Sequence, residues 1–339
     1  MPENTSKLAD AFSLAIYQIS PLSECVSYIM IKGTNSQMFL CRPWENILLW
    51  ANKVEDRHLP YGDTKFEGHY ASLNYCISGR CEICLPDDTY IYMEPGTLCI
   101  DEHRPKNGYW YPGGSYTGLE IVFDLDRLLE HTIPALSAYC DYDGWVREML
   151  FGHAGTYLAA VEDKCDRLSN LLYSHLVAAD WTREDYRIHL LLLLYTLVND
   201  GTVPATDHFY VTKGQKRIAE EVERTITQDL SRHDTISELA DRYGISPSAL
   251  KKYFETVYGL PISYYLREKR VLLAKQRLSE TKDSVGVIAA ACGYTNQGKF
   301  GTVFRERTGM SPLEYRRLNY REKFAGDASK QGGNHDKTK

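Results

Sequence analysis

The chain has 339 residues, of which 43% are apolar and 25% are charged, and its formal net charge at neutral pH is −6. This composition excludes a largely disordered chain, and the length is enough for about two domains. The longest strongly apolar run, Leu190–Val198, is about half as long as a membrane span. We therefore expect a cytoplasmic protein with no membrane partner. The charge is uneven, because residues 1–212 hold 15 Lys and Arg against 29 Asp and Glu, whereas residues 213–323 hold 21 against 14, which predicts that only the C-terminal third meets a polyanion.

Short apolar runs separated by turn residues fill the region from about 60 to 125. LNYCI (73–77), CEICL (81–85), TYIYM (89–93) and TLCI (97–100) follow one another closely, and YTGLEIVFDL (116–125) has the pattern of one more strand. Closely spaced short strands are typical of a sandwich or a small barrel. The many aromatic residues of the region 60–125 could either fill a core or line a small-molecule pocket, and the sequence is consistent with both roles.

Helical periodicity replaces the strand pattern from residue 126. Apolar residues recur at three- and four-residue spacing over 165–179, and 186–200 is apolar on nearly all sides, which requires cover by a core or by a second subunit. We therefore expect β-structure within residues 1–125, a helical segment 126–200 that pairs two subunits, and a Gly-, Pro- and Thr-containing linker over 201–214. Residues 321–339 have almost nothing to bury and are expected to form a disordered tail.

The helical region 215–320 contains an internal duplication, in which 235–267 aligns with 284–317. Each copy has the pattern of a helix-turn-helix, over 235–256 and 284–306. In the first copy Thr235 and Glu238 have the spacing of a capping box, Gly244 occupies the turn, and Ser246 caps a second helix. A plain helical bundle with two similar hairpins is the alternative, but duplication, capping and basic charge on one segment favour DNA binding.

Three stretches carry a resemblance to a known family: ISELADRYGISPSALKKYFETVYG, REKRVLLAKQRL and VIAAACGYTNQGKFGTVFRERTGMSPLEYRR. Residues 215–318 resemble the DNA-binding domain of the AraC/XylS transcription regulators. The N-terminal part more loosely resembles the cupin-like ligand-sensing and dimerisation region of the same regulators. The implied fold is an α+β multidomain protein, with an N-terminal cupin-like β-barrel and following helices, and a C-terminal all-α domain of two helix-turn-helix units joined by a long helix.

The resemblance also implies a function. The protein would be a homodimeric, ligand-responsive regulator that binds promoter DNA, activates transcription through contact with RNA polymerase, and responds to an unknown small-molecule effector. No cofactor, bound metal or catalytic residue is expected, and the protein is not expected to be an enzyme.

Both recognition helices are expected to enter successive major-groove segments of one duplex face. The family's DNA-contacting positions correspond here to Ser246, Ser248, Lys251 and Lys252 in the first copy and to Thr295, Asn296, Gln297, Gly298, Lys299, Gly301 and Thr302 in the second, with Arg305 and Arg307 directed at phosphates. Lysine donates to guanine or to a phosphate, and both options stay open for the first helix. In the second helix a glutamine pairs with adenine, and a threonine methyl group meets thymine.

Two glycines inside the second recognition helix require an explanation, since each costs roughly 1 kcal/mol relative to alanine in a helix interior. Gly298 and Gly301 cannot read bases through side chains. Our hypothesis is that they let the helix backbone lie close to the groove.

The N-terminal residues allow two other functions, a thiol-based redox sensor and a cupin metalloenzyme. The nine cysteines include a Cys81-Glu82-Ile83-Cys84 motif, which permits a thiol-based redox sensor, although alternation along a strand places Cys81 and Cys84 on opposite faces and favours core cysteines. A cupin metalloenzyme tethered to DNA would need two histidines one residue apart, whereas His58, His69 and His103 stand alone.

Overall fold

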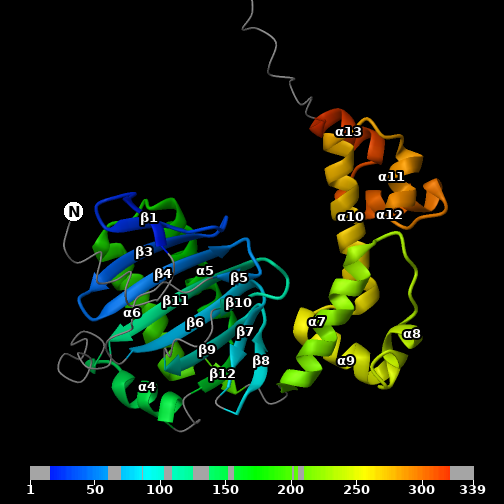
Figure 1. Ribbon diagram of the computed structural model, residues 1–339. Helices are drawn as coiled ribbons and strands as arrows, with labels where there is room; N and C mark the ends of the chain where they lie inside the picture. Colours follow the sequence, from blue (N-terminus) through cyan, green and yellow to red (C-terminus); the bar gives the residue numbers. More distant parts are fainter. Residues whose placement is uncertain are drawn as a thin grey trace, which may run out of the picture. The chain divides into compact units, whose positions relative to one another are not determined.

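The computed structural model describes residues 16–59, 70–85, 87–102, 109–124, 137–151, 156–200, 202–204 and 210–320 (Figure 1). Two compact units divide the chain: the first covers residues 1–217 and the second most of residues 218–339. The predicted disordered tail, 321–339, lies outside the described residues, as do the segment 125–136 and the residues His69 and His103.

The first unit is built on a nine-stranded antiparallel sheet in the order β1-β2-β3-β4-β11-β6-β9-β12-β13. Its strands are β1 (Ile16–Pro21), β2 (Val26–Ile31), β3 (Gln37–Trp44), β4 (Ile47–Val54), β6 (Tyr70–Gly79), β9 (Thr97–Glu102), β11 (Tyr116–Asp124), β12 (Thr156–Val161) and β13 (Thr202–Pro204). Two smaller sheets join β10 (Tyr109–Trp110) to β5 (His58–Leu59), and β8 (Thr89–Met93) to both β7 (Cys81–Cys84) and β14 (Val211–Thr212).

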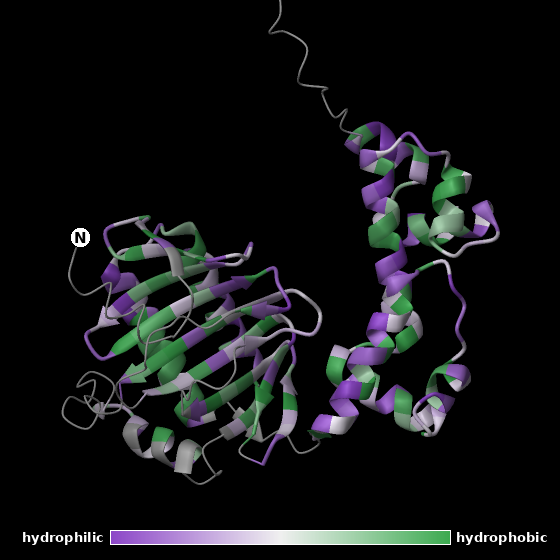
Figure 2. Cartoon of the chain, in the orientation of Figure 1, coloured by the Kyte–Doolittle hydropathy of each residue, from purple (hydrophilic) through white to green (hydrophobic). Residues whose placement is uncertain are grey.

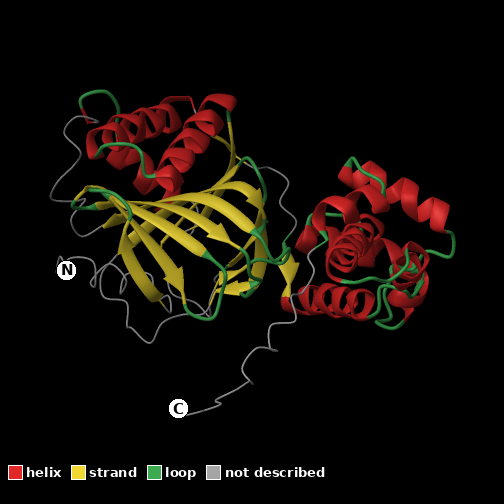
Figure 3. Ribbon diagram, turned by 90° about the horizontal axis from the view of Figure 1, so that it is seen from above, coloured by secondary structure: helices red, strands yellow, loops and turns green. Residues whose placement is uncertain are grey.

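Alternation along these strands divides their side chains between two cores. One core contains Leu49, Leu73 and Leu119 and is shared with the helices α4 (Tyr142–Phe151), α5 (Asp163–Ala178) and α6 (Arg183–Asp200). Figure 3 shows these helices gathered on one side of the curved sheet. The other core contains Trp50, Cys99 and Val122, and we call its side of the sheet the inner face.

The sheet is larger than the sequence predicts. Strands β1–β4 precede residue 60, where the strand pattern was expected to begin, and β12 lies inside the segment 126–200, which was expected to be helical. Because β12 pairs with β9 over five residues, from Thr156 with Asp101 to Ala160 with Thr97, the sheet and the helices form one unit instead of separate regions divided at 125. Among the described residues no pairing joins β1 to β13, so a closed cupin barrel is not what the structure shows.

The second unit is helical, as predicted. It comprises most of α7 (Lys213–Gln228), followed by α8 (Ile236–Asp241), α9 (Pro247–Tyr258), α10 (Ile262–Glu280), α11 (Val285–Ala291), α12 (Gln297–Thr308) and α13 (Pro312–Asn319). Purple and green alternate along these helices in Figure 2, as expected for short helices with one buried side. No described helix is long and apolar enough to cross a membrane.

Candidate nucleic-acid interface

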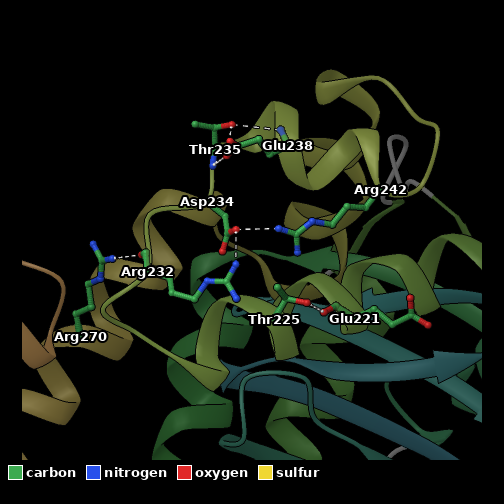
Figure 4. Close-up of polar contacts among 8 residues, drawn as sticks. All are labelled: Glu221, Thr225, Arg232, Asp234, Thr235, Glu238, Arg242 and Arg270. Carbon is green, nitrogen blue, oxygen red and sulfur yellow. Dashed lines mark hydrogen bonds and ion pairs between the residues drawn. The ribbon is translucent and has the colours of Figure 1, made fainter.

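The first helix-turn-helix consists of α8, a turn and α9. The Thr235 hydroxyl accepts from the Glu238 backbone N–H at 3.2 Å, and the Glu238 carboxylate accepts from the Thr235 N–H at 2.7 Å, which confirms the predicted capping box (Figure 4). Gly244 has a φ of +62° at the turn, a conformation that glycine adopts without strain. The Ser246 hydroxyl then accepts from the Ala249 N–H at 3.2 Å and starts α9.

The second helix-turn-helix consists of α11, a turn and α12, and it repeats this construction with different residues. Ser284 caps α11, Gly293 has a φ of +74°, and Asn296 caps α12 by accepting from the Lys299 N–H at 2.9 Å. On the inner side of α12, Phe300 and Phe304 are buried among side chains of α10 and α11. Because Phe300 and Phe304 hold one side of α12 in the core, the opposite side of this helix faces outward.

The structure exposes the residues predicted to meet DNA. In the first helix-turn-helix the exposed residues are Ser246, Ser248, Lys251 and Lys252, and in the second they are Thr295, Asn296, Gln297, Gly298, Lys299, Thr302 and Arg305, while Gly301 is half-buried. Two of these side chains already have roles within the helix: Asn296 is the N-cap, and the Thr302 hydroxyl donates to the Gly298 carbonyl at 3.2 Å. The predicted contact of Thr302 with thymine uses its methyl group, which this hydroxyl bond does not occupy.

The two arginines near the end of α12 differ in their surroundings. Arg305 is 64% exposed and lies 3.6 Å from the Glu314 carboxylate, a surface pair that costs little to break. Arg307 is 25% exposed, pairs with Glu268 at 3.1 Å and donates to the Tyr264 hydroxyl at 2.7 Å. Arg305 is thus available for a phosphate, whereas Arg307 ties α12 to α10.

The two glycines of α12 are not equivalent in the folded chain. A Cβ added at Gly298 would lie 3.1 Å from the Asn296 Oδ1 atom that caps the helix, so the cap itself restricts this position. A Cβ added at Gly301 would meet nothing within 4 Å. The fold therefore gives no reason for glycine at 301, and close approach of DNA remains our hypothesis for it.

Gly301→Ala is expected to stabilise the second unit by about 1 kcal/mol, because alanine is the better helix former and the space is open. It is also expected to weaken DNA binding by about tenfold, which corresponds to about 1.4 kcal/mol. Thermal unfolding followed by circular dichroism and a gel-shift titration measure the two effects. Gly214→Ala in α7, where an added Cβ meets only Thr212 Oγ1 at 4.0 Å, is the control with unchanged DNA affinity. Unchanged affinity for the Gly301 variant would remove the close-approach hypothesis.

Three buried cysteines of the first unit, Cys76, Cys81 and Cys99, lie in environments that suppress the thiolate. Burial raises the pKa of Cys76 to about 12 and the pKa of Cys81 and Cys99 well above the ordinary thiol value. Because the thiolate is the form that reacts with oxidants, these residues are poorly suited to redox sensing. Among the described residues, no group of three or more His, Cys, Asp or Glu is arranged to hold a metal ion.

A family model matches the C-terminal part of the chain, and two curated relatives match about a third of its length. A family model described as "Helix-turn-helix domain" matches residues 239–318. The transcriptional activator RhaR of Klebsiella pneumoniae is 30% identical over 112 residues, which are 33% of this chain and 40% of that protein. The bifunctional transcriptional activator and DNA repair enzyme AdaA of Bacillus subtilis is 30% identical over 105 residues, 31% of this chain and 48% of that protein.

The chain thus spans less than half the length of these curated relatives. A solved structure described as a probable AraC family transcriptional regulator from Rhodopseudomonas palustris is 27% identical and covers 31% of this chain and 99% of that chain, with a TM-score of 0.28. The family model and the relatives confirm the resemblance stated for the C-terminal third. They do not extend to a cupin at the N-terminus.

Proposed function

We propose that the protein is a sequence-specific DNA-binding transcription regulator of the AraC type, because its C-terminal third matches a helix-turn-helix domain model and the chain is similar to two transcriptional activators. The observation that carries the proposal is the pair of helix-turn-helix units whose second helices, α9 and α12, both expose polar and basic residues on the side away from the core. Each of these helices would lie in one of two successive segments of the major groove.

Activation of transcription is the direction that we propose. RhaR and AdaA are both named as transcriptional activators. A cytoplasmic location, contact with RNA polymerase and the absence of enzymatic activity belong to the same proposal. The alternative of a redox-sensing regulator is disfavoured by the burial of Cys76, Cys81 and Cys99.

Lys299→Ala is expected to weaken binding to the promoter and to reduce the slope of log affinity against log salt by about one, because one phosphate contact is lost. Gel-shift titrations at several salt concentrations measure the slope. Lys275→Ala, in α10 and outside both recognition helices, is the control and should leave the slope unchanged. An unchanged slope with relaxed sequence preference in the Lys299 variant would mean that this lysine reads a base.

We propose further that the first unit senses a small molecule at its inner face. Five polar residues, which we call the inner polar cluster, share this face of the central strands: Asn52, Ser72, Asn74, Asp101 and Glu120. Asn52 donates to the Glu120 carboxylate at 3.1 Å, and Ser72 donates to the Asp101 carboxylate at 2.8 Å.

Asn52, Ser72 and Glu120 are buried, and we propose that this group of polar residues in a core is where a ligand binds. Its carboxyl and amide oxygens suit a ligand that donates hydrogen bonds. Mass spectrometry of small molecules that co-purify with the protein from its native host tests the proposal. A ligand whose affinity is unchanged in an Asn52→Ala variant would place the sensor elsewhere.

The dimer is proposed on helix α6. Ile188, Leu192 and Tyr195 lie at i, i+4 and i+7 and are 62%, 42% and 38% exposed, although most other apolar residues of this helix are buried. We propose that a second copy of the chain covers this stripe, as the apolar pattern of 186–200 predicts. Sedimentation equilibrium measures the mass, and a monomer at micromolar concentration would contradict the proposal.

A further inference from the structure

The segment before the first helix-turn-helix is held at several points. We call residues 229–234, between α7 and the cap of α8, the entry loop. The Asp234 carboxylate is 10% exposed and pairs with Arg232 at 3.1 Å and with Arg242, at the end of α8, at 2.8 Å (Figure 4). Thr235, the next residue, caps α8. The position of the entry loop therefore determines where α8 begins.

The entry loop is also tied to the long helix α10 by one side chain. The Arg270 Nε atom donates to the Leu230 carbonyl at 2.9 Å. Its Nη2 atom donates to the Arg232 carbonyl, also at 2.9 Å, as Figure 4 shows. A guanidinium group presents these two donors on separate nitrogens in a fixed fork, whereas the single nitrogen of lysine cannot occupy both positions.

The same guanidinium lies against the turn of the second helix-turn-helix. Its carbon is 5.8 Å from the centre of the Tyr294 ring, and the residue before this tyrosine is Gly293. A Cβ added at Gly293 would lie 2.6 Å from Arg270 Nη2 and 2.7 Å from the Leu230 carbonyl oxygen. Glycine is thus required here both by its φ of +74° and by the close approach of the entry loop.

Arg270 consequently contacts both helix-turn-helix units, through the entry loop of the first and the turn of the second. We propose that Arg270 is a positioning residue that fixes the separation and relative rotation of the two recognition helices, and thereby the spacing between the two DNA segments that the protein accepts. This inference rests on the proposed function, because it concerns how the two helix-turn-helix copies read one duplex. Arg270 itself need not touch DNA.

Spacing is a stringent property of such a pair. One inserted base pair moves the second segment by about 3.4 Å and rotates it by about 35° around the duplex axis, so a rigid pair of helices cannot follow it. Two recognition helices that are no longer held at a fixed separation could adjust to the changed spacing. Loss of Arg270 should therefore relax the spacing requirement, an effect that a general loss of stability does not produce.

The test uses the full chain and a duplex selected by the wild-type protein from a random-sequence library. Footprinting locates the two contacted segments, and derivatives are made with one base pair inserted or removed between them. The wild-type protein is expected to bind these derivatives about tenfold or more weakly than the selected duplex, and Arg270→Lys to reduce this ratio to about threefold or less. Arg277→Lys, on the same helix but in a partly exposed pair with Asp283, is the matched control and should keep the wild-type ratio.

The outcomes separate the two proposals. If the wild-type protein enriches no duplex, the proposed function fails. If it binds but ignores spacing, or if Arg270→Lys discriminates as the wild-type protein does, the role of Arg270 is overturned. Should Arg270→Lys lose its helical circular dichroism, Tyr294→Leu takes its place, because it removes the ring contact and leaves both carbonyl bonds; an unchanged ratio in that variant would equally contradict the proposal.

Discussion

Replacing Phe304 with alanine is expected to destabilise the second unit by about 3–5 kcal/mol and to abolish sequence-specific DNA binding. Phe304 is fully buried on the inner side of α12. The centre of its ring lies 5.8 Å from the centre of the Phe300 ring and 5.5 Å from that of Tyr315, which it meets edge-on. A loss of this size is a large part of the free energy of unfolding of a small domain. Without Phe304 in the core, α12 would no longer hold its outer side in place for DNA.

Two optical signals separate this effect from general unfolding. All five tryptophans lie within residues 1–217, so their fluorescence reports the first unit alone. Phe304→Ala should leave the fluorescence transition in place and lower the helical transition seen by circular dichroism. Leu313→Ala, a 66% exposed position of α13, is the control with little effect on either signal. Full DNA affinity in the Phe304 variant would refute the role of α12.

Glu120→Gln is expected to stabilise the first unit by about 3 kcal/mol at pH 8 and by much less at pH 4. Burial in the inner polar cluster raises the pKa of Glu120 from 4.5 to about 7, and each pH unit of such a difference corresponds to about 1.4 kcal/mol. Between these two values the unfolded chain has lost its proton while the folded chain retains it. The free energy of unfolding therefore falls as the pH rises from about 4.5 to 7 and levels off above that.

Urea unfolding followed by tryptophan fluorescence measures this dependence across the pH range. Glutamine retains an oxygen for the Asn52 amide and has no proton to lose, so the variant should lack the decrease between pH 4.5 and 7. Glu148→Gln, on the exposed side of α4, is the control and should follow the wild-type curve. A wild-type curve without the decrease would show that Glu120 is ionised inside the fold.

Much of the second unit could be predicted from sequence because its determinants are local. The capping box of Thr235 and Glu238, the turn glycine Gly244 and the buried pair Phe300 and Phe304 all act within a few residues of one another. Such signals survive in a single sequence. Once Phe300 and Phe304 are assigned to the core, helical periodicity predicts which residues of α12 are exposed.

Other features depend on residues that are far apart in the sequence. Strands β3 and β4 were missed because they are buried on both faces, as in ILLWANKV (47–54), and give no alternation. Strand β12 is a short run between helices, and its pairing with β9 is not encoded locally. Arg270 reads as an ordinary basic residue of a long helix, because its partners lie 38 to 40 residues earlier in the chain.

The central claim is that α9 and α12 read two segments of one duplex. Selection of duplexes from a random library by the full chain, followed by hydroxyl-radical footprinting of the enriched sequence, tests it most directly. The account predicts two protected segments on one face of the duplex, about one helical turn, or 10 base pairs, apart. A single protected segment, or no enrichment over random DNA, would contradict it.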